Sequence, residues 1–422
     1  MSPSPPAATS PVTARLRRAR LGVFGIFFVV GLGMAAWLVS IPAVQQRTGI
    51  SHATLGLLLL VLGAGGVIGM QIAGYAITRW GSKIVTGAAL GLYVVAVNLP
   101  VHTTGSVSLG LALLTFGLAN GAVDVSMNDQ AVIVERGYGR PIMSAFHAFW
   151  SVGGAAGALI GAAALGLGYQ VSAAVLVASV AAAVGGVVCV RLLLAREPAP
   201  TADATTDPGA VPSTTPAVGR SIRRRVIGFG VLAFLLMLAE GVANDWSALH
   251  AVEHLDQPTS AAALAFATFA VAMTVGRLTV DRIAGRFGPA FVVRYGSLAA
   301  AVGIAVVMVS PVFGLTLVGW AVFGLGLAGV VPQLFTAAGN ISATNQSIIL
   351  SRVVGAGYVG QLAGPALVGV VAGWIGLNLA FALPLIFCVV AVIVAPIVSR
   401  PTEAVEETSA AWVEPSYETD RA

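Results

Sequence analysis

The stretch GYAITRWGSK, from Gly74 to Lys83, has a counterpart in the second half of the chain. Its RWG triplet recurs as RFG 207 positions later, within GRLTVDRIAGRFG from Gly276 to Gly288. The same offset aligns a second triplet and a pair of glycines: Phe116–Leu118 with Phe323–Leu325, and Gly153 and Gly157 with Gly360 and Gly364. Several matches at one offset predict that the chain consists of two duplicated halves.

Long apolar runs fill both halves. Of the 422 residues, 57% are hydrophobic and only 9% are charged, whereas a soluble protein carries about 25% charged residues. A run of about 20 apolar residues crosses a bilayer as a helix. Twelve runs have this length: 21–43, 53–78, 83–102, 106–132, 141–166, 171–194, 226–250, 259–283, 289–309, 312–337, 347–372 and 377–399. We therefore predict an all-α integral membrane protein with twelve transmembrane helices in two six-helix bundles.

The basic residues indicate how these helices are oriented. The chain has 22 Lys and Arg residues. If the N-terminus is inside, most of them fall in or near cytoplasmic segments, and only Arg47 falls on the outer side. Cytoplasmic loops of membrane proteins carry an excess of Lys and Arg. This distribution predicts that both termini are cytoplasmic, and it explains the basic pI without a nucleic acid partner.

Composition divides the chain into five predicted segments. Residues 1–20 form a disordered cytoplasmic tail, and residues 400–422 form an acidic cytoplasmic tail. Residues 195–225 are rich in Pro, Thr and Ala and lack an apolar period, so we predict a cytoplasmic linker. This linker separates an N-terminal bundle, 21–194, from a C-terminal bundle, 226–399.

The repeated loops resemble a signature of the major facilitator superfamily, in which a Gly and an acidic position precede Arg, Gly and a basic pair. The first copy has Thr78 at the acidic position, whereas the second copy keeps Arg277 and Asp281. NDQAVIVERGYGRPIMSAFHAFWSVGG (Asn128–Gly154) and EGVANDWSALH (Glu240–His250) resemble the fucose-permease-like branch, and within it the YbjJ-like group of inner-membrane permeases. The resemblance implies a twelve-helix, two-bundle fold, alternating access and a bacterial cytoplasmic-membrane location.

Charges in and near the two loops are candidate gating residues: Arg79, Lys83, Arg277, Asp281 and Arg286. Charges near helix ends can pair with helix dipoles and neighbouring helices in one conformation and release them in another. The alternative is that these charges serve only topology or packing.

GAVDVSMNDQ, from Gly121 to Gln130, places polar residues inside an apolar run. Asn120, Asp124 and Asn128 are four residues apart, so they form one stripe on the predicted fourth helix. An ionised acid at the bilayer centre costs about 2.5–3.5 kcal/mol, so the stripe should face the bundle interior. In the second half, the position equivalent to Asp124 under the offset of 207 is Val331, so the polar stripe is present in the first half only. We predict substrate binding by all three residues and proton coupling by Asp124; a helix–helix hydrogen bond is the alternative.

Glu240 is a second intramembrane carboxyl group, and Asn244 lies one turn later on the same helix face. A partly desolvated carboxyl group can exchange a proton near neutral pH, and no basic partner is apparent nearby in the sequence. His147 shares a face with Ser144 and Ser151, and histidine titrates in the same range. We predict proton coupling by Glu240 and His147, and substrate binding by Glu240 and Asn244. A structural role for Glu240, and a bond from His147 to a neighbouring helix, are the alternatives.

Four further side chains are weaker candidates for substrate binding, because each is also explained by packing: Trp37, Gln333, Tyr358 and Gln361. An aromatic platform with amides suits sugars or other polar solutes. The sequence contains no Gly-rich nucleotide loop and no His/Cys metal cluster. We therefore predict that the protein is not an enzyme and needs no cofactor.

These observations lead us to expect a secondary active transporter that moves a small polar solute, sugar-like or another metabolite, with the proton as coupling ion. Internal repeats with a site between them are typical of such proteins. We expect a monomer in the lipid bilayer. Two alternatives stay open. One is a proton-driven efflux antiporter for amphipathic compounds, which would need a more aromatic cavity than 7% aromatic residues indicate. The other is a non-transporting membrane sensor or scaffold.

Overall fold

Helices account for nearly all of the computed structural model, which describes residues 13–195, 216–342 and 345–398. Within these ranges, twelve helical spans are long and apolar enough to cross a membrane. The helices of the first half are α1 (Ala14–Thr48), α2 (His52–Trp80), α3 (Ser82–Ala96), η1 (Pro100–His102), α4 (Ser106–Tyr138), α5 (Met143–Gly166) and α6 (Val171–Leu192). Those of the second half are α7 (Pro216–Leu255), α8 (Thr259–Phe287), α9 (Pro289–Val309), α10 (Phe313–Leu327), α11 (Val330–Gly339), α12 (Gln346–Ile375), α13 (Leu377–Ala380), α14 (Ala382–Val394) and η2 (Ala395–Val398). The predicted all-α, twelve-span architecture is confirmed.

Two helices begin earlier than their apolar runs predict. Helix α1 starts at Ala14, where the Thr13 side chain accepts a hydrogen bond from the amide of Leu16 at 3.2 Å. The prediction of disorder up to residue 20 is therefore wrong from Ala14 onward. Helix α7 starts at Pro216 instead of residue 226, since basic residues extend a helix as readily as apolar ones. The remaining predicted tail and linker positions, 1–12, 196–215 and 399–422, lie outside the described residues.

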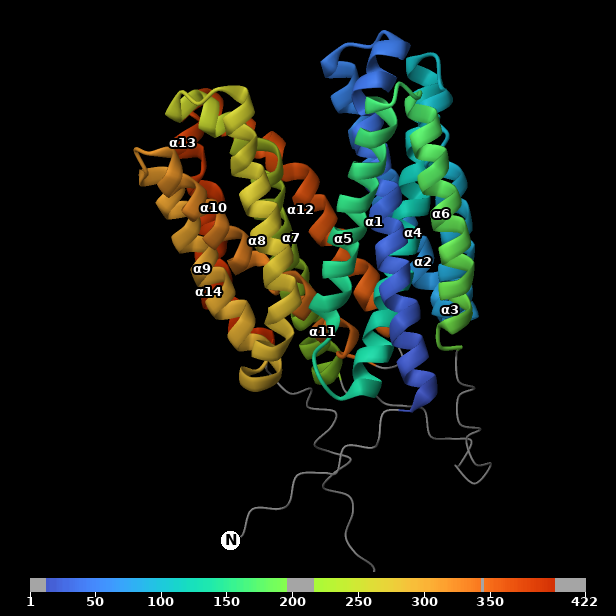
Figure 1. Ribbon diagram of the computed structural model, residues 1–422. Helices are drawn as coiled ribbons and strands as arrows, with labels where there is room; N and C mark the ends of the chain where they lie inside the picture. The colour runs from blue at the N-terminus through green and yellow to red at the C-terminus, as the bar shows by residue number, and fades with distance from the viewer. Residues whose placement is uncertain (1–12, 196–215, 343–344, 399–422) are drawn as a thin grey trace, which may run out of the picture.

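The two halves form two bundles, α1–α6 and α7–η2, which stand side by side in Figure 1. Their duplication recurs in the packing of equivalent glycines. A side chain at Gly153 of α5 would collide with the backbone of Phe28 on α1. Its counterpart Gly360 of α12 faces the backbone of Phe234 on α7 in the same way. Glycine therefore lets one helix pair pack closely in each bundle.

The tenth span is broken into α10 and α11 around Ala328 and Gly329. Pro332 lies in the first turn of α11 and has no amide hydrogen, so it cannot bond to the preceding turn. Helix α12 also contains a Gly–Pro pair, Gly364 and Pro365, but it passes through that pair as one continuous element.

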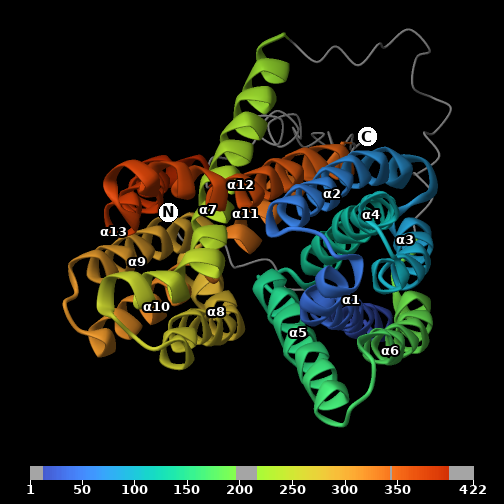
Figure 2. The same ribbon diagram turned by 90° about the horizontal axis from the view of Figure 1, so that it is seen from above.

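The bundles meet near one end of the molecule. We call the end that carries Arg79, Arg140 and Arg286 the arginine-rich end, and the end that carries Arg47 the far end. In Figure 1 the bundles converge at the lower, arginine-rich end, where α5, α8 and α11 lie together, and diverge toward the far end. Figure 2 shows α12 beside α2 and α5 facing α8, so these two helix pairs form two sides of the junction between the bundles.

Candidate functional site

Asp124 lies on α4 near the level at which the two bundles meet. Its side chain is buried. The Tyr358 hydroxyl group, on α12 of the other bundle, lies close enough to the Asp124 carboxyl group for the two to interact electrostatically. Tyr358 is also close enough to Glu240 of α7 for the two groups to interact electrostatically. Tyr358 therefore connects the two intramembrane acids that the sequence singles out, one from each bundle.

Glu240 has a basic partner that the sequence did not reveal. The Arg277 guanidinium group of α8 lies 3.5 Å from Glu240 Oε1, and both side chains are largely buried, with 10% and 16% exposed. The same guanidinium group donates a hydrogen bond of 2.9 Å to the Ser151 hydroxyl of α5, across the junction. The absence of a basic partner, inferred from the sequence, is therefore corrected, because the partner comes from the next helix, 37 positions away.

Arg277 thus has a different environment from the other candidate gating residues. It lies one turn before Asp281 in the sequence, and both contact α5 of the opposite bundle. Arg277, however, contacts the central acid Glu240, whereas Asp281 contacts the beginning of α5. The predicted gating pair therefore separates into one residue of the central cluster and one residue nearer the arginine-rich end.

Several polar atoms of this central region are buried without a hydrogen-bond partner. Within the described ranges they are Asp124 Oδ2, Asn128 Oδ1, His147 Nε2, Arg277 Nε and Gln333 Nε2. Buried polar groups are nearly always hydrogen-bonded, and each unpaired one costs about 1–3 kcal/mol. Atoms that carry this cost on four different helices can bind water or a polar solute that enters between the bundles.

The polar stripe of α4 forms as expected. Asn120, Asp124 and Asn128 are all buried on this helix. Asn128 Nδ2 donates to the backbone carbonyl of Asp124 at 2.9 Å, so its amide oxygen is the atom left for another partner. His147 packs against the rings of Phe27 and Phe335. Within the described residues the His147 side chain makes no hydrogen bond to a neighbouring helix, so the alternative predicted for it is not observed, and His147 Nε2 and Asn128 Oδ1 both lack a partner.

The weaker candidates have different environments. Trp37 is 1% exposed and packs edge-on against Phe116 inside the first bundle, so its position is that of a core residue. Gln333 is buried on α11, whereas Gln361 is half-buried on α12. Asn244 is exposed, one turn beyond Glu240 toward the far end. Gln333 and Asn244 thus remain candidates for substrate binding, with Asn244 lying nearer the far end.

Asp281 joins α8 to the beginning of α5. Its carboxylate accepts hydrogen bonds from the amides of Ser144 at 3.1 Å and Ala145 at 2.8 Å. The first amides of a helix have no partner within the helix and attract negative charge. This contact therefore fixes the second bundle to the first at the arginine-rich end.

The other predicted gating residues make contacts within their own bundles. Lys83 Nζ donates to the carbonyls of Arg191 and Leu193, both at 3.0 Å, and so caps the end of α6 within the first bundle. The guanidinium groups of Arg79 and Arg286 lie over the rings of the aromatic residues that follow them in the chain. In this conformation the Lys83 bonds stabilise one bundle rather than the junction.

Sequence reasoning missed the polar contacts that join α4 to α12. The Asp129 carboxylate accepts hydrogen bonds from Gln346 at 3.0 Å and Ser347 at 2.8 Å, in the first turn of α12. Arg136 donates to Asn340 at 2.8 Å and to Gln346 at 2.9 Å. The signal was present in the sequence, because Asp129 is an acid within an apolar run, the feature that singled out Asp124.

Glu135 makes a further contact across the junction. Its carboxylate accepts hydrogen bonds from the Thr336 hydroxyl of α11 at 2.6 Å, and from the amides of Ile142 and Met143 at 2.7 Å each. In the described residues, the hydrogen bonds between the bundles all lie between mid-helix and the arginine-rich end. This conformation is therefore closed at the arginine-rich end.

A duplicated, twelve-span helical fold with a polar cluster between two bundles defines the class of membrane transporters. The family model of the Major Facilitator Superfamily matches residues 23–258 and 229–417. The chain belongs to this superfamily, and it is a transporter, not an enzyme.

Curated relatives agree with this assignment. An uncharacterised transporter of the same superfamily from Yersinia pestis is 37% identical over 355 residues, covering 84% of this chain and 89% of that protein. The membrane protein MosC of Rhizobium meliloti is 32% identical over 354 residues, covering 83% of each. An uncharacterised transporter from Sinorhizobium fredii is 31% identical over 389 residues, covering 90% of this chain and 98% of that protein.

Solved structures share the fold. The transporter FucP in its outward conformation superposes with a TM-score of 0.73 at 16% identity, covering 90% of this chain and 98% of that one. The human organic anion transporter MFSD10 gives a TM-score of 0.71 at 16% identity, covering 90% and 99%.

Proposed function

We propose that this protein is a proton-coupled symporter of a small, polar, uncharged solute. The observation that carries the proposal is the set of unpaired polar atoms around Asp124, His147 and Gln333, buried where the bundles meet. Such atoms favour a ligand that supplies both donors and acceptors, as hydroxyl groups do. A polyhydroxylated metabolite fits this requirement better than an amphipathic compound, because amides and carboxyl groups surround the site.

The central acids give the proposal its coupling step. Ionised Glu240 attracts Arg277, which in turn donates to Ser151 of the opposite bundle. A proton on Glu240 would remove the negative charge and free Arg277 to change its partners. Asp124 of the first bundle and Tyr358 of the second also lie close enough at this level to interact electrostatically. Protonation and solute binding would be linked because each changes the same contacts across the junction.

The closed end defines the state in the proposed cycle. We place the arginine-rich end in the cytoplasm of a bacterial cell, with both termini inside, on the strength of the positive-inside distribution. The conformation then faces outward. Release of solute to the cytoplasm requires the contacts of Asp129, Glu135 and Asp281 to break. We assign these acids, together with Arg136, to the cytoplasmic gate of a monomeric transporter in the cytoplasmic membrane.

Purified protein in liposomes that hold a pH-sensitive dye tests this function. A panel of sugars and small polar metabolites is added outside to wild type, Asp124→Asn, Glu240→Gln and Glu253→Gln. Glu253 is an exposed acid near the far end of α7 and serves as the matched control. We expect one solute class to acidify the lumen in wild type and Glu253→Gln, and at least tenfold less in the two central variants.

Other outcomes would contradict the proposal. Radiolabelled solute that moves without a pH change would exclude proton coupling and indicate a uniporter or another ion. Proton release driven by an amphipathic compound would indicate an efflux antiporter. If the wild type gave no pH change with any solute of the panel and took up no labelled solute, a role other than uptake would be favoured.

A further inference from the structure

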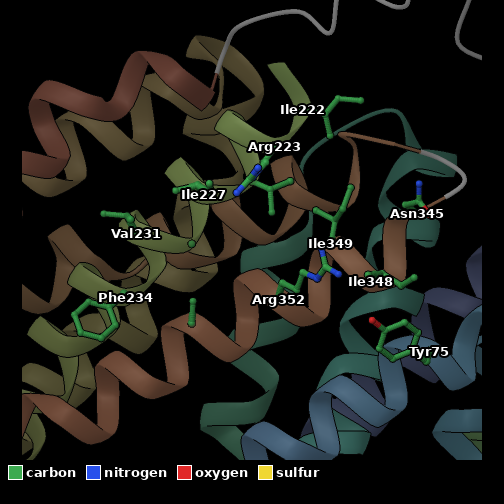
Figure 3. A pocket seen from close by; sticks show the side chains of 13 residues that line it. Tyr75, Ile222, Arg223, Ile227, Val231, Phe234, Asn345, Ile348, Ile349 and Arg352 are labelled. Carbon is green, nitrogen blue, oxygen red and sulfur yellow. The ribbon is translucent and has the colours of Figure 1, made fainter. Parts of the chain in front are cut away.

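A groove lies at the outer edge of the junction, separate from the central polar cluster. It has a volume of about 1020 Å³ and is formed by α7 and α12, with Tyr75 of α2 on its rim. Figure 3 shows Arg223 and Arg352 projecting into it, with Phe234 at the opposite end. The groove therefore combines a basic region near the arginine-rich end with walls that are otherwise apolar.

Among the residues that the structure describes, the two arginines lack a counter-charge. Arg223 and Arg352 are both exposed, and within the described parts of the chain neither has a hydrogen bond or an ion pair. Two guanidinium groups on facing helices of one groove repel each other unless an anion lies between them. Guanidinium groups bind phosphate through paired N–H donors, so the end of the groove that carries the two arginines has the chemistry of a phosphate site.

The apolar walls continue from the arginines toward the middle of the helices. Arg223, Ile227, Val231 and Phe234 follow one face of α7 at steps of four, four and three residues. Eleven residues of helix rise roughly 16 Å, close to the roughly 15 Å of hydrocarbon in one leaflet of a bilayer. Ile227 and Val231 are 56% and 50% exposed, so this face is available to a neighbouring hydrocarbon chain.

We infer that the groove binds one anionic phospholipid. Its phosphate lies between Arg223 and Arg352, and an acyl chain follows the apolar face of α7 toward Phe234. Basic pockets between transmembrane helices at a membrane surface bind anionic head groups in this manner. A lipid fits this groove better than a soluble anion does, because a leaflet-length apolar wall continues from the paired arginines and a soluble anion would need only the arginines. This site is independent of the transported solute.

Native mass spectrometry of the full-length protein tests the site. The protein is purified in detergent, incubated with phosphatidylglycerol or phosphatidylcholine, and scored for bound lipid. The variants are Arg223→Gln/Arg352→Gln, which removes the charges, and Val231→Trp, which fills the apolar wall without changing charge. The matched control is Arg224→Gln/Arg282→Gln, which removes two exposed arginines that do not line the groove.

We expect wild type and the control to keep one phosphatidylglycerol, and the two groove variants to keep it at least fivefold less often. All proteins must elute as single symmetric peaks, so that loss of lipid is not loss of fold. Equal retention in every variant, or equal loss in the control, would overturn the site. Protection of the wild type against heat by soluble glycerol phosphate as well as by the lipid would show that the ligand is a soluble anion.

Discussion

Asp281 and Gly74 occupy equivalent positions of the two halves, 207 residues apart, but close the junction in different ways. The Asp281 carboxylate accepts hydrogen bonds from the amides that begin α5, including that of Ser144. Gly74 instead packs against Ser351, the counterpart of Ser144, and a side chain built there would lie 2.5 Å from its hydroxyl oxygen. One side of the duplicated junction is thus closed by charge, and the other by close packing.

The charged side predicts the effect of Asp281→Asn. Removing the negative charge from a helix N-terminus costs about 1–2 kcal/mol in a partly buried site, or roughly 5- to 30-fold in an equilibrium. We expect the arginine-rich end to open more often. Spin labels at Trp80→Cys and Phe287→Cys, both exposed positions, measure the separation of the two bundles there. Cys189 and Cys388 are replaced by alanine beforehand.

A second pair of labels provides the control for this experiment. Val107→Cys and Val312→Cys lie in the two bundles near the far end and are exposed. Alternating access requires their distance to shorten when the other pair separates. An unchanged distribution at both ends in Asp281→Asn would mean that the carboxylate does not hold the junction closed.

The packed side predicts that Gly74→Ala opens the same end. The added methyl group would lie too close to Ser351 for α2 and α12 to keep their present distance. We expect the population separated at Trp80 and Phe287 to increase at least threefold. Gly91→Ala, on α3, is the matched control, because no neighbouring atom lies within 4 Å of the added group. A similar shift in both variants would point to general loosening of the bundle.

The Glu240–Arg277 pair predicts a non-additive effect on stability. Removing one partner of a buried ion pair leaves an uncompensated charge and costs about 3–5 kcal/mol, whereas removing both is often nearly neutral. We expect Arg277→Gln to lower the unfolding temperature more than Glu240→Gln/Arg277→Gln does. Thermal unfolding in detergent measures this difference. Additive losses would show that the two side chains are not coupled.

Tyr358→Phe tests whether the Tyr358 hydroxyl group, which lies close to Asp124, binds the solute. A hydrogen bond from this hydroxyl group to a bound solute would contribute about 0.5–1.5 kcal/mol. We therefore expect roughly a 2- to 13-fold weakening of solute binding, with the protein still folded. Counterflow of the solute that emerges from the liposome panel measures this effect. An unchanged affinity would place the hydroxyl group outside the binding site.

Arg47 is the one arginine that the predicted topology places on the outer side, and the structure shows a specific partner for it. Its guanidinium group donates to the carbonyls of Thr103 at 3.1 Å and Pro100 at 3.3 Å, which ties the end of α1 to the loop after α3. We expect Arg47→Gln to cost about 1 kcal/mol of stability, since the side chain is exposed. Arg17→Gln should leave the unfolding temperature unchanged.

The number and positions of the spans could be predicted from the sequence, because the bilayer requires an apolar length that composition reveals directly. The sequence also singled out Asp124 and Glu240 as candidates, since an acid within an apolar run needs an explanation. The identity of their partners could not be predicted. Arg277 lies on a neighbouring helix, and Tyr358 lies in the other bundle, so both contacts depend on how helices pack.

The junction itself was the least predictable part. Lys83 lies in the family signature but caps α6 within its own bundle. Asp129 and Glu135 lie outside that signature, yet they contact α11 and α12 of the other bundle. A linear motif identifies residues that recur between halves, whereas contacts between the halves join positions that are not equivalent by duplication.

The carboxylate contacts at the arginine-rich end have a kinetic consequence. When the bundles separate there, each freed carboxylate and amide can exchange its protein partner for water, and the net loss is only about 0.5–1.5 kcal/mol per hydrogen bond. A seal of apolar side chains would instead lose about 25 cal/mol for every Å² that it exposed. The proposed gate of Asp129, Glu135 and Asp281 would therefore open by exchanging protein partners for water, and hydration of these three acids would begin the change from the outward-facing to the inward-facing conformation.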